Sequence, residues 1–130
     1  MLFFGHRFLE NESFYHICDI DTILKTPPSS TLFVDFNESN LDIIKHLNEN
    51  GISFVLSVTN ITELVYASTL DAKYICIATE LAKTAQSIAE DYMFDAKILV
   101  KIEDEKEIEE LVLLGVDGVL FSNAIIKINS

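Results

Sequence analysis

The stretch GHRFLENESF, residues 5–14, brings three chemically capable side chains close together in the sequence. His6 could act as a general acid or base, Arg7 could hold an anion through two hydrogen bonds, and Glu10 could bind a divalent metal. Arg7 is the only arginine of the chain, so a bidentate grip on an anion has to come from it. The alternative, which we favour, is that GHR ends a strand and ENES forms a turn.

A second group lies within the apolar runs FVDF, VLSV and LVKI, which contain Asp35, Ser57 and Lys101. In α/β sheets, ligands bind at the carboxyl ends of the strands, where these residues stand. Asp35 and Lys101 could transfer protons, or Lys101 could form a Schiff base with a carbonyl compound. We favour a structural role, in which the two residues form an ion pair or Lys101 extends to water.

Polar residues that follow the strands are further candidates for ligand binding at the same ends of the sheet. Together with Ser57 they are Asn37, Thr59, Asn60, Thr79, Glu103, Ser122 and Asn123. His16 and His46 stand alone and are assigned no role.

Apolar runs of strand length must position these side chains. They are TLFVDF (31–36), ISFVLSV (52–58), KYICIA (73–78), AKILVKI (96–102) and DGVLF (117–121). Runs that are apolar throughout are typical of parallel strands covered by helices on both faces. Amphipathic segments alternate with them. Their expected N-caps are Asn37, Asn60 and Asp104, and Asn50-Gly51 is an expected helix end.

An internal repeat supports alternating strands and helices. Residues 54–81 align without a gap on residues 98–125, and Ser57 and Lys101 are equivalent in this alignment. Repeated βα units build both barrels and open sheets, but a full barrel needs about 250 residues. We therefore predict one α/β domain over residues 1–130, with a predominantly parallel sheet of about five to six strands and flanking helices. It would be a half-TIM-barrel or a flavodoxin-like open sheet.

The N-terminal region, residues 1–30, does not follow the repeat. FYHIC (14–18) is expected to pair into the sheet. LFFGHRF (2–8) is expected to be an edge strand or the hairpin partner of FYHIC. DIDTILKT (19–26) predicts a short helix that ends at Pro27.

Composition limits the possible partners and location. The chain carries 21 acidic and 9 basic residues, a net charge of −12, which disfavours nucleic acid as a partner. No apolar run approaches the ~20 residues that cross a bilayer, and no signal peptide is recognisable, so we expect a cytoplasmic protein without membrane contact. Cys18 and Cys76 lack metal-site spacing, and both are expected to be buried thiols.

The segment ILVKIEDEKEIEELVLLGVDGVLFSNAI (98–125) resembles the last βαβ unit of (βα)8-barrel proteins. Glycerophosphodiester phosphodiesterases end in this way, and indole-glycerol-phosphate synthases carry a similar segment. The His-Arg pair followed by Glu-Asn also resembles the beginning of glycerophosphodiester phosphodiesterases.

This resemblance implies a metal-dependent phosphodiesterase with an acid–base histidine, a charge-neutralising arginine and metal-binding carboxylates. Carried over residue by residue, these are His6, Arg7, Glu10, Asp19 and Asp21. The sequence departs from the family's pattern, because Phe8 stands where the family has Gly and the gap to Glu-Asn is shorter. We expect no cofactor unless this interpretation holds, in which case a divalent metal is required.

Two hypotheses about function follow. The favoured one is a small, non-catalytic α/β module that acts through self-association or contact with another protein. The alternative is a metal-dependent phosphodiesterase-like hydrolase, or another small-molecule enzyme, with its site at the strand ends. Because an open sheet leaves edges to cover, we also predict a homodimer that uses LFFGHRF or the outer face of a helix.

Overall fold

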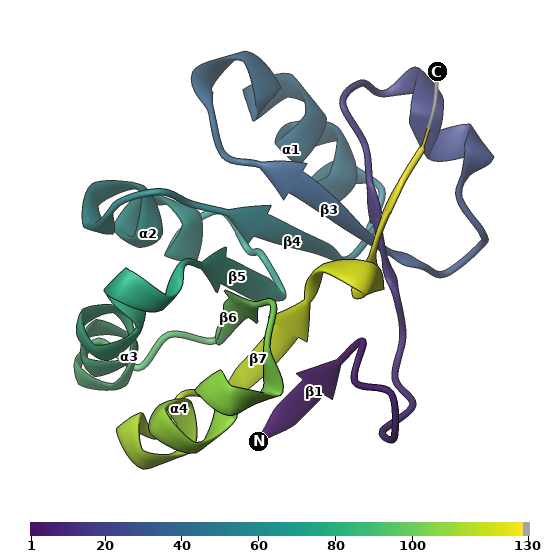
Figure 1. Cartoon of the computed structure of the whole chain (residues 1–130). Coiled ribbons are helices and arrows are strands. Elements are labelled where there is room, and N and C mark those ends of the chain that lie inside the picture. The colour runs from purple at the N-terminus through teal and green to yellow at the C-terminus, as the bar shows by residue number, and fades with distance from the viewer. Residues whose placement is uncertain (129–130) are drawn as a thin grey trace.

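The computed structural model describes residues 1–128 and contains one curled sheet in which all strands are parallel (Figure 1). The order of its eight strands is β1-β7-β6-β5-β4-β3-β2-β8. They are β1 (Leu2–Phe4), β2 (Phe14–His16), β3 (Thr31–Asp35), β4 (Phe54–Ser57), β5 (Tyr74–Ile77), β6 (Lys97–Ile102), β7 (Gly118–Phe121) and β8 (Ile125–Lys127). The predicted α/β class with a parallel, half-barrel-like sheet is confirmed.

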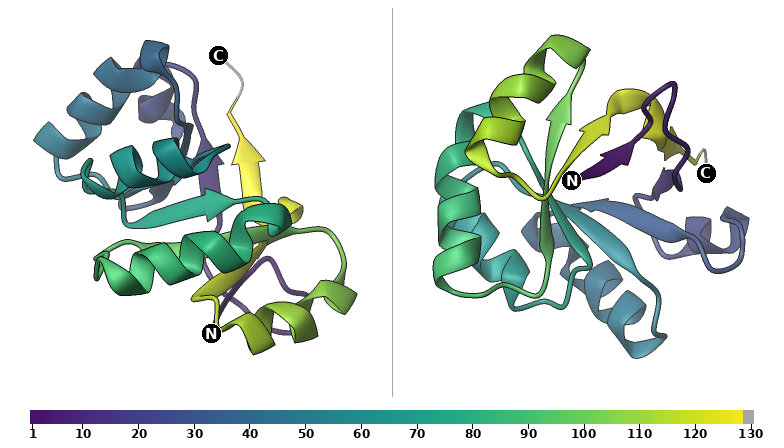
Figure 2. Two further views of the ribbon diagram at one scale, coloured as in Figure 1. Left: turned by 90° about the vertical axis from the view of Figure 1, so that its left-hand side faces the viewer. Right: turned by 90° about the horizontal axis from the view of Figure 1, so that it is seen from below.

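α-Helices connect the successive strands from β3 to β7 and lie on the outer, convex side of the sheet (Figure 2). They are α1 (Leu41–Glu49), α2 (Ile61–Ser68), α3 (Ala82–Asp91) and α4 (Ile108–Leu114). Asn60 caps α2 as predicted, since its side chain accepts a hydrogen bond from the Glu63 backbone N–H at 2.8 Å. Asp104 similarly caps the 3-10 turn before α4. Asn37 makes no cap hydrogen bond, because its side-chain oxygen accepts from the Ser39 hydroxyl instead.

The prediction of five to six strands is wrong, because the sheet has eight. β8 begins directly after a 3-10 turn at Ser122–Ala124 and has only three residues. Such a short run shows no recognisable strand period in the sequence. Since no α-helix separates β1 from β2, β2 from β3 or β7 from β8, eight strands fit into 130 residues.

The hairpin alternative for the N-terminal region is also wrong. β1 pairs with β7, whereas β2 pairs with β3 and β8. LFFGHRF therefore supplies an edge strand, and FYHIC joins the sheet as predicted. The free edge of β1 is bonded within the chain, since the Asn11 side-chain amide donates to the Phe3 carbonyl at 3.1 Å. The short helix predicted at 19–26 is a 3-10 helix at Asp21–Lys25.

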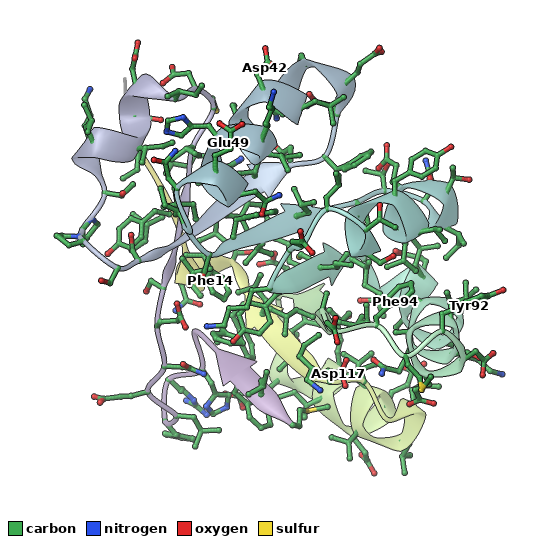
Figure 3. All side chains as sticks on the ribbon, turned by 180° about the vertical axis from the view of Figure 1, so that it is seen from behind. Phe14, Asp42, Glu49, Tyr92, Phe94 and Asp117 are labelled. Atoms are coloured by element: carbon green, nitrogen blue, oxygen red, sulfur yellow. The ribbon has the colours of Figure 1, made fainter. Side chains whose placement is uncertain are left out.

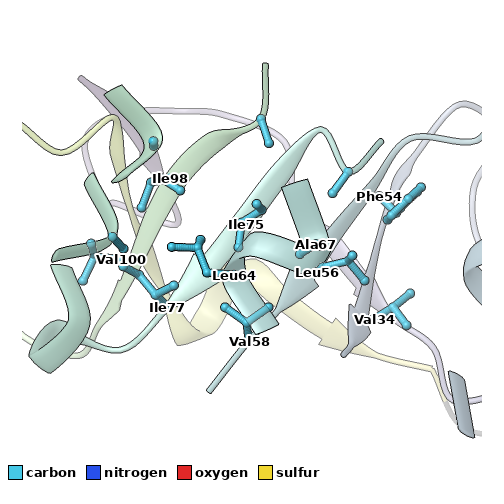
Figure 4. Packing of buried hydrophobic residues seen from close by; sticks show 14 of the residues in the cluster. Val34, Phe54, Leu56, Val58, Leu64, Ala67, Ile75, Ile77, Ile98 and Val100 are labelled. Carbon is cyan, nitrogen blue, oxygen red and sulfur yellow. The ribbon is translucent and has the colours of Figure 1, made fainter. Parts of the chain in front are cut away.

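The larger hydrophobic core lies between the outer face of the sheet and the helices. Figure 4 shows Leu64 and Ala67 of α2 against the strands, and both side chains are fully buried. Strand residues around them in the same cluster are Val34, Leu56, Ile75, Ile77, Ile98 and Val100. This packing explains why the outer face of these strands is apolar.

The inner face of the sheet encloses a second core of aromatic and aliphatic side chains. Phe14 of β2 and Tyr74 of β5 belong to strands that are not neighbours, yet their ring centroids lie 5.7 Å apart. Phe4 of β1, at one end of the strand order, lies 4.8 Å from Phe14 near the other end. Such contacts require a sheet that curls until its ends approach each other. The complete set, termed the inner core, is Phe4, Phe14, Phe33, Val55, Tyr74, Cys76, Leu99, Leu120 and Ala124.

Candidate functional site

A layer of polar residues lies above the inner core, at the carboxyl ends of the strands. Side chains of a strand alternate between its two faces, so the residue two positions after an inner-facing one points to the same side. Six strands, β2, β3, β4, β5, β6 and β8, have such an inner-facing residue two or three positions before their carboxyl end. These residues belong to or pack on the inner core and are Phe14, Phe33, Val55, Tyr74, Leu99 and Ile125, and the rule selects one residue on each of the six strands. The selected residues, termed the mouth layer, are His16, Asp35, Ser57, Cys76, Lys101 and Lys127.

Half of the mouth layer was expected from the sequence. Asp35, Ser57 and Lys101 lie on one face of the sheet at its carboxyl end, where their positions in the apolar runs predict them. His16 and Lys127 were not expected there. Their strands, FYH and IIK, alternate correctly but are too short for alternation to be recognised without the strand pairing.

Cys76 forms the floor of the mouth layer. Burial raises the pKa of this thiol to about 12, an effect that the Lys101 ammonium opposes and the Asp35 carboxylate reinforces. The thiol is therefore protonated at neutral pH and offers no thiolate nucleophile. Because Lys101 and Asp35 both act on the same thiol, their charged groups share one mouth.

Asp35 pairs with His16, not with Lys101. His16 Nε2 lies 3.0 Å from Asp35 Oδ2, and the His16 ring packs edge-on against Phe33 with 5.1 Å between centroids. A carboxylate can only accept hydrogen bonds, so Nε2 carries the proton in this pair. The expected ion pair between Asp35 and Lys101 does not form within residues 1–128.

Lys101 and Ser57 thus face the mouth with unused hydrogen-bonding groups. Neither side chain has a hydrogen-bond or ion-pair partner in the described part of the chain. Lys101 is exposed, and Ser57 is half-buried. An ammonium group and a hydroxyl are therefore available to a ligand beside the protonated Cys76 thiol.

Lys127 brings a second ammonium group to the mouth. β8 pairs with β2 so that Lys127 stands directly beside His16, and Ile125 of the same strand packs against the inner core. Lys127 forms no ion pair with any described residue. The mouth layer therefore has an excess of positive charge, on a chain whose net charge is −12.

The N-terminal candidates His6 and Arg7 form a separate cluster with Glu105. Gly5, with a φ of +83°, turns the chain so that His6 packs on three aromatic rings outside the mouth layer. Arg7 Nε donates to Glu105 Oε1 at 2.9 Å, and His6 Nε2 lies 3.5 Å from the same oxygen. The Phe8 backbone N–H donates to His6 Nδ1 at 3.1 Å. Both ring nitrogens of His6 therefore have partners within the chain.

The carboxylates implied by the phosphodiesterase resemblance do not gather at this cluster. Glu10 lines a small hollow with His6 and Arg7. Asp19 instead accepts a hydrogen bond from the backbone of the 3-10 helix Asp21–Lys25, which contains Asp21. Over residues 1–128, no three His, Cys, Asp or Glu side chains form a group that could hold a metal ion.

Most polar candidates at the strand ends bond within the chain. The Asn123 amide, for example, donates to the Gly5 carbonyl at 2.9 Å, and the Ser122 hydroxyl donates to Glu103. The others that bond in this way are Asn37, Thr59, Asn60 and Thr79. Ser57 is the candidate of this set whose side chain has no partner in the part of the chain that the structure describes.

The prediction that both cysteines are buried is wrong for Cys18, which is exposed. Ile17 takes the buried position just after β2, and the following residue therefore turns outward. Cys76 is buried as predicted, and both thiols are free.

No helix within residues 1–128 combines the length and apolarity needed to span a membrane. No protein-family model and no curated protein matches the chain, so its function has to be inferred from the mouth layer itself.

Proposed function

We propose that the protein is a cytoplasmic binding module for a small anionic molecule, which the mouth layer holds by a carboxylate or phosphate group. The observation that carries this proposal is Lys101. It points into the mouth without a carboxylate partner in the described chain, because Asp35 pairs with His16. An unpaired ammonium group beside the free Ser57 hydroxyl supplies the donors that an oxyanion accepts.

Position and charge both support this function. Ligands of α/β sheets bind at the carboxyl ends of the strands, which is where the mouth layer lies. The remainder of the chain is strongly acidic and repels anions, so a positively charged mouth is the surface that attracts them.

We predict that inorganic phosphate or a small carboxylate raises the Tm of the protein and that Lys101→Met removes this effect. A ligand at 100 times its Kd stabilises the folded state by about 2.7 kcal/mol. For a domain of this size, the rise in Tm is on the order of 10 °C. Thermal unfolding at constant ionic strength, with Kd from calorimetry, measures both quantities.

Lys97→Met is the matched control. Lys97 is an exposed lysine of the same strand, at its opposite end and in register with Tyr74 of the inner core. This variant should bind anions as the wild type does. Equal loss of binding in both variants, or no anion-dependent shift in the wild type, would contradict the proposed function.

A hollow between α2 and α3 favours self-association as a second function. The hollow measures about 630 Å³ and has Val65, Ile88 and Phe94 in its lining. Tyr92 and Met93 also line it and are 76% and 84% exposed. Figure 3 shows Tyr92 and Phe94 together at one side of the molecule. A two-fold interface uses the same patch on both copies, and this face offers a second copy of the chain a hollow together with exposed apolar side chains.

We therefore predict a homodimer formed through this helical face, with twice the chain mass of 14.7 kDa in light scattering. Met93→Glu should produce the monomer, because it places a charge in the contact. Leu24→Glu, which changes a 92% exposed leucine elsewhere, should leave the dimer intact. A wild-type mass of 14.7 kDa at micromolar concentration would refute self-association.

A further inference from the structure

We infer that the ligand of the mouth layer is a small dianion, with one anionic group bound by Lys101 and the other by Lys127. Such a ligand would bridge β6 and the edge strand β8. This inference rests on the proposed anion binding and adds the class of ligand.

The curl of the sheet places the two lysines on opposite walls of one mouth. Lys127 stands beside His16 on β2, and Lys101 lies on β6, which pairs with β5. β2 and β5 meet through Phe14 and Tyr74, whose ring centroids are 5.7 Å apart directly below the mouth layer. The two lysines therefore face the same space above the inner core.

No group of the mouth layer neutralises either lysine. Its carboxylate, Asp35, is bound by His16 at 3.0 Å. Lys101 and Lys127 have no ion pair with any residue that the structure describes. Two ammonium groups on one mouth repel each other, and a dianion relieves this repulsion at both, whereas a monoanion neutralises only one of them.

A ligand that bridges Lys101 and Lys127 should also stabilise the edge strand β8. β8 has three residues and one neighbour in the strand order, β2, so few hydrogen bonds hold it. A ligand that binds Lys127 would add a contact to this strand, and the opening of β8 should become rarer when the ligand is present.

The experiment compares acetate, which has one anionic group, with succinate, glutarate and 2-phosphoglycolate, which have two. Affinities are measured by calorimetry at constant ionic strength. We expect at least one dianion to bind about tenfold or more tightly than acetate, because it gains a second charge-assisted contact. Lys127→Met should remove most of this gain and weaken acetate binding far less, because acetate has no second group for Lys127 to bind, whereas Lys101→Met should weaken both. Lys97→Met should bind all four compounds as the wild type does.

Amide hydrogen exchange gives a second readout. The best dianion should slow exchange at Ile125–Lys127 in the wild type, and acetate at equal occupancy should not. Preference for 2-phosphoglycolate over both dicarboxylates would assign a phosphate to one of the two groups, and preference for a dicarboxylate would assign two carboxylates.

The outcomes separate this inference from the proposed function. Suppose that anions bind in a Lys101-dependent manner, but acetate binds as well as every dianion or Lys127→Met has no effect. The inference that the ligand is a dianion is then refuted, and the proposed anion binding stands. If no anion binds in a Lys101-dependent manner, both are refuted.

Discussion

Phe14→Ala is expected to destabilise the protein by roughly 3–5 kcal/mol, the range for removing a large aromatic side chain from a well-packed core. Phe14 is fully buried. Its ring lies 4.8 Å from that of Phe4 and 5.7 Å from that of Tyr74, measured between centroids. It thus joins strands from both ends of the strand order, and no neighbouring helix can refill the space inside the curl. Denaturant unfolding measures the loss.

The same substitution should weaken anion binding in the protein that remains folded. Phe14 precedes His16 on β2 and pairs with Ile125, which precedes Lys127 on β8. A cavity below His16 and Lys127 would allow these side chains to move, so the mouth layer would hold a ligand less firmly. Phe8→Ala removes a ring that is 70% exposed, and it should cost less than about 1 kcal/mol and leave binding intact. Similar losses in the two variants would show that Phe14 does not hold the curled sheet together.

The fold could be predicted in part, because both faces of the central strands are covered. β3 to β7 are apolar runs in the sequence, and their alternation with helices indicates a parallel sheet. The closure of the sheet could not be predicted in the same way. It depends on β1, β2 and β8, each of three residues, and on the pairing of β2 with β8 across more than a hundred residues of chain.

The candidate site could likewise be predicted only in part from the sequence. Asp35, Ser57 and Lys101 are visible in the sequence because each is a polar residue within an apolar run. The partner of Asp35 is not visible, since His16 reaches it from a strand that the sequence shows only weakly. Lys127 becomes a site residue only when β8 is paired with β2. Residue types alone therefore indicate which strand ends are polar, whereas strand pairing decides which charges remain unpaired.

Gly118→Ala is expected to detach β1 from the sheet, because a methyl group has no space at this position. An added Cβ would lie 2.8 Å from Leu2 Cβ, 2.8 Å from Leu99 Cδ2 and 2.9 Å from the Leu2 carbonyl oxygen. The Leu99 side chain is fully buried, and the Leu2 backbone is held by the pairing of β1 with β7. Relief therefore requires β1 to move. Overpacking of this kind costs about 1–3 kcal/mol.

The position of the damage distinguishes this prediction from a general loss of stability. Hydrogen exchange should become fast at Leu2–Phe4 in Gly118→Ala, while the amides of β4 and β5 stay protected. Gly51→Ala is the control, since an added Cβ there meets no atom within 4 Å. Gly51 has a φ of +64°, so alanine strains the turn after α1 without disturbing β1. Detachment of β1 would also withdraw Phe4 from its contact with Phe14. Gly118→Ala should therefore weaken Lys101-dependent anion binding, and unchanged binding would show that the mouth forms without the edge strand.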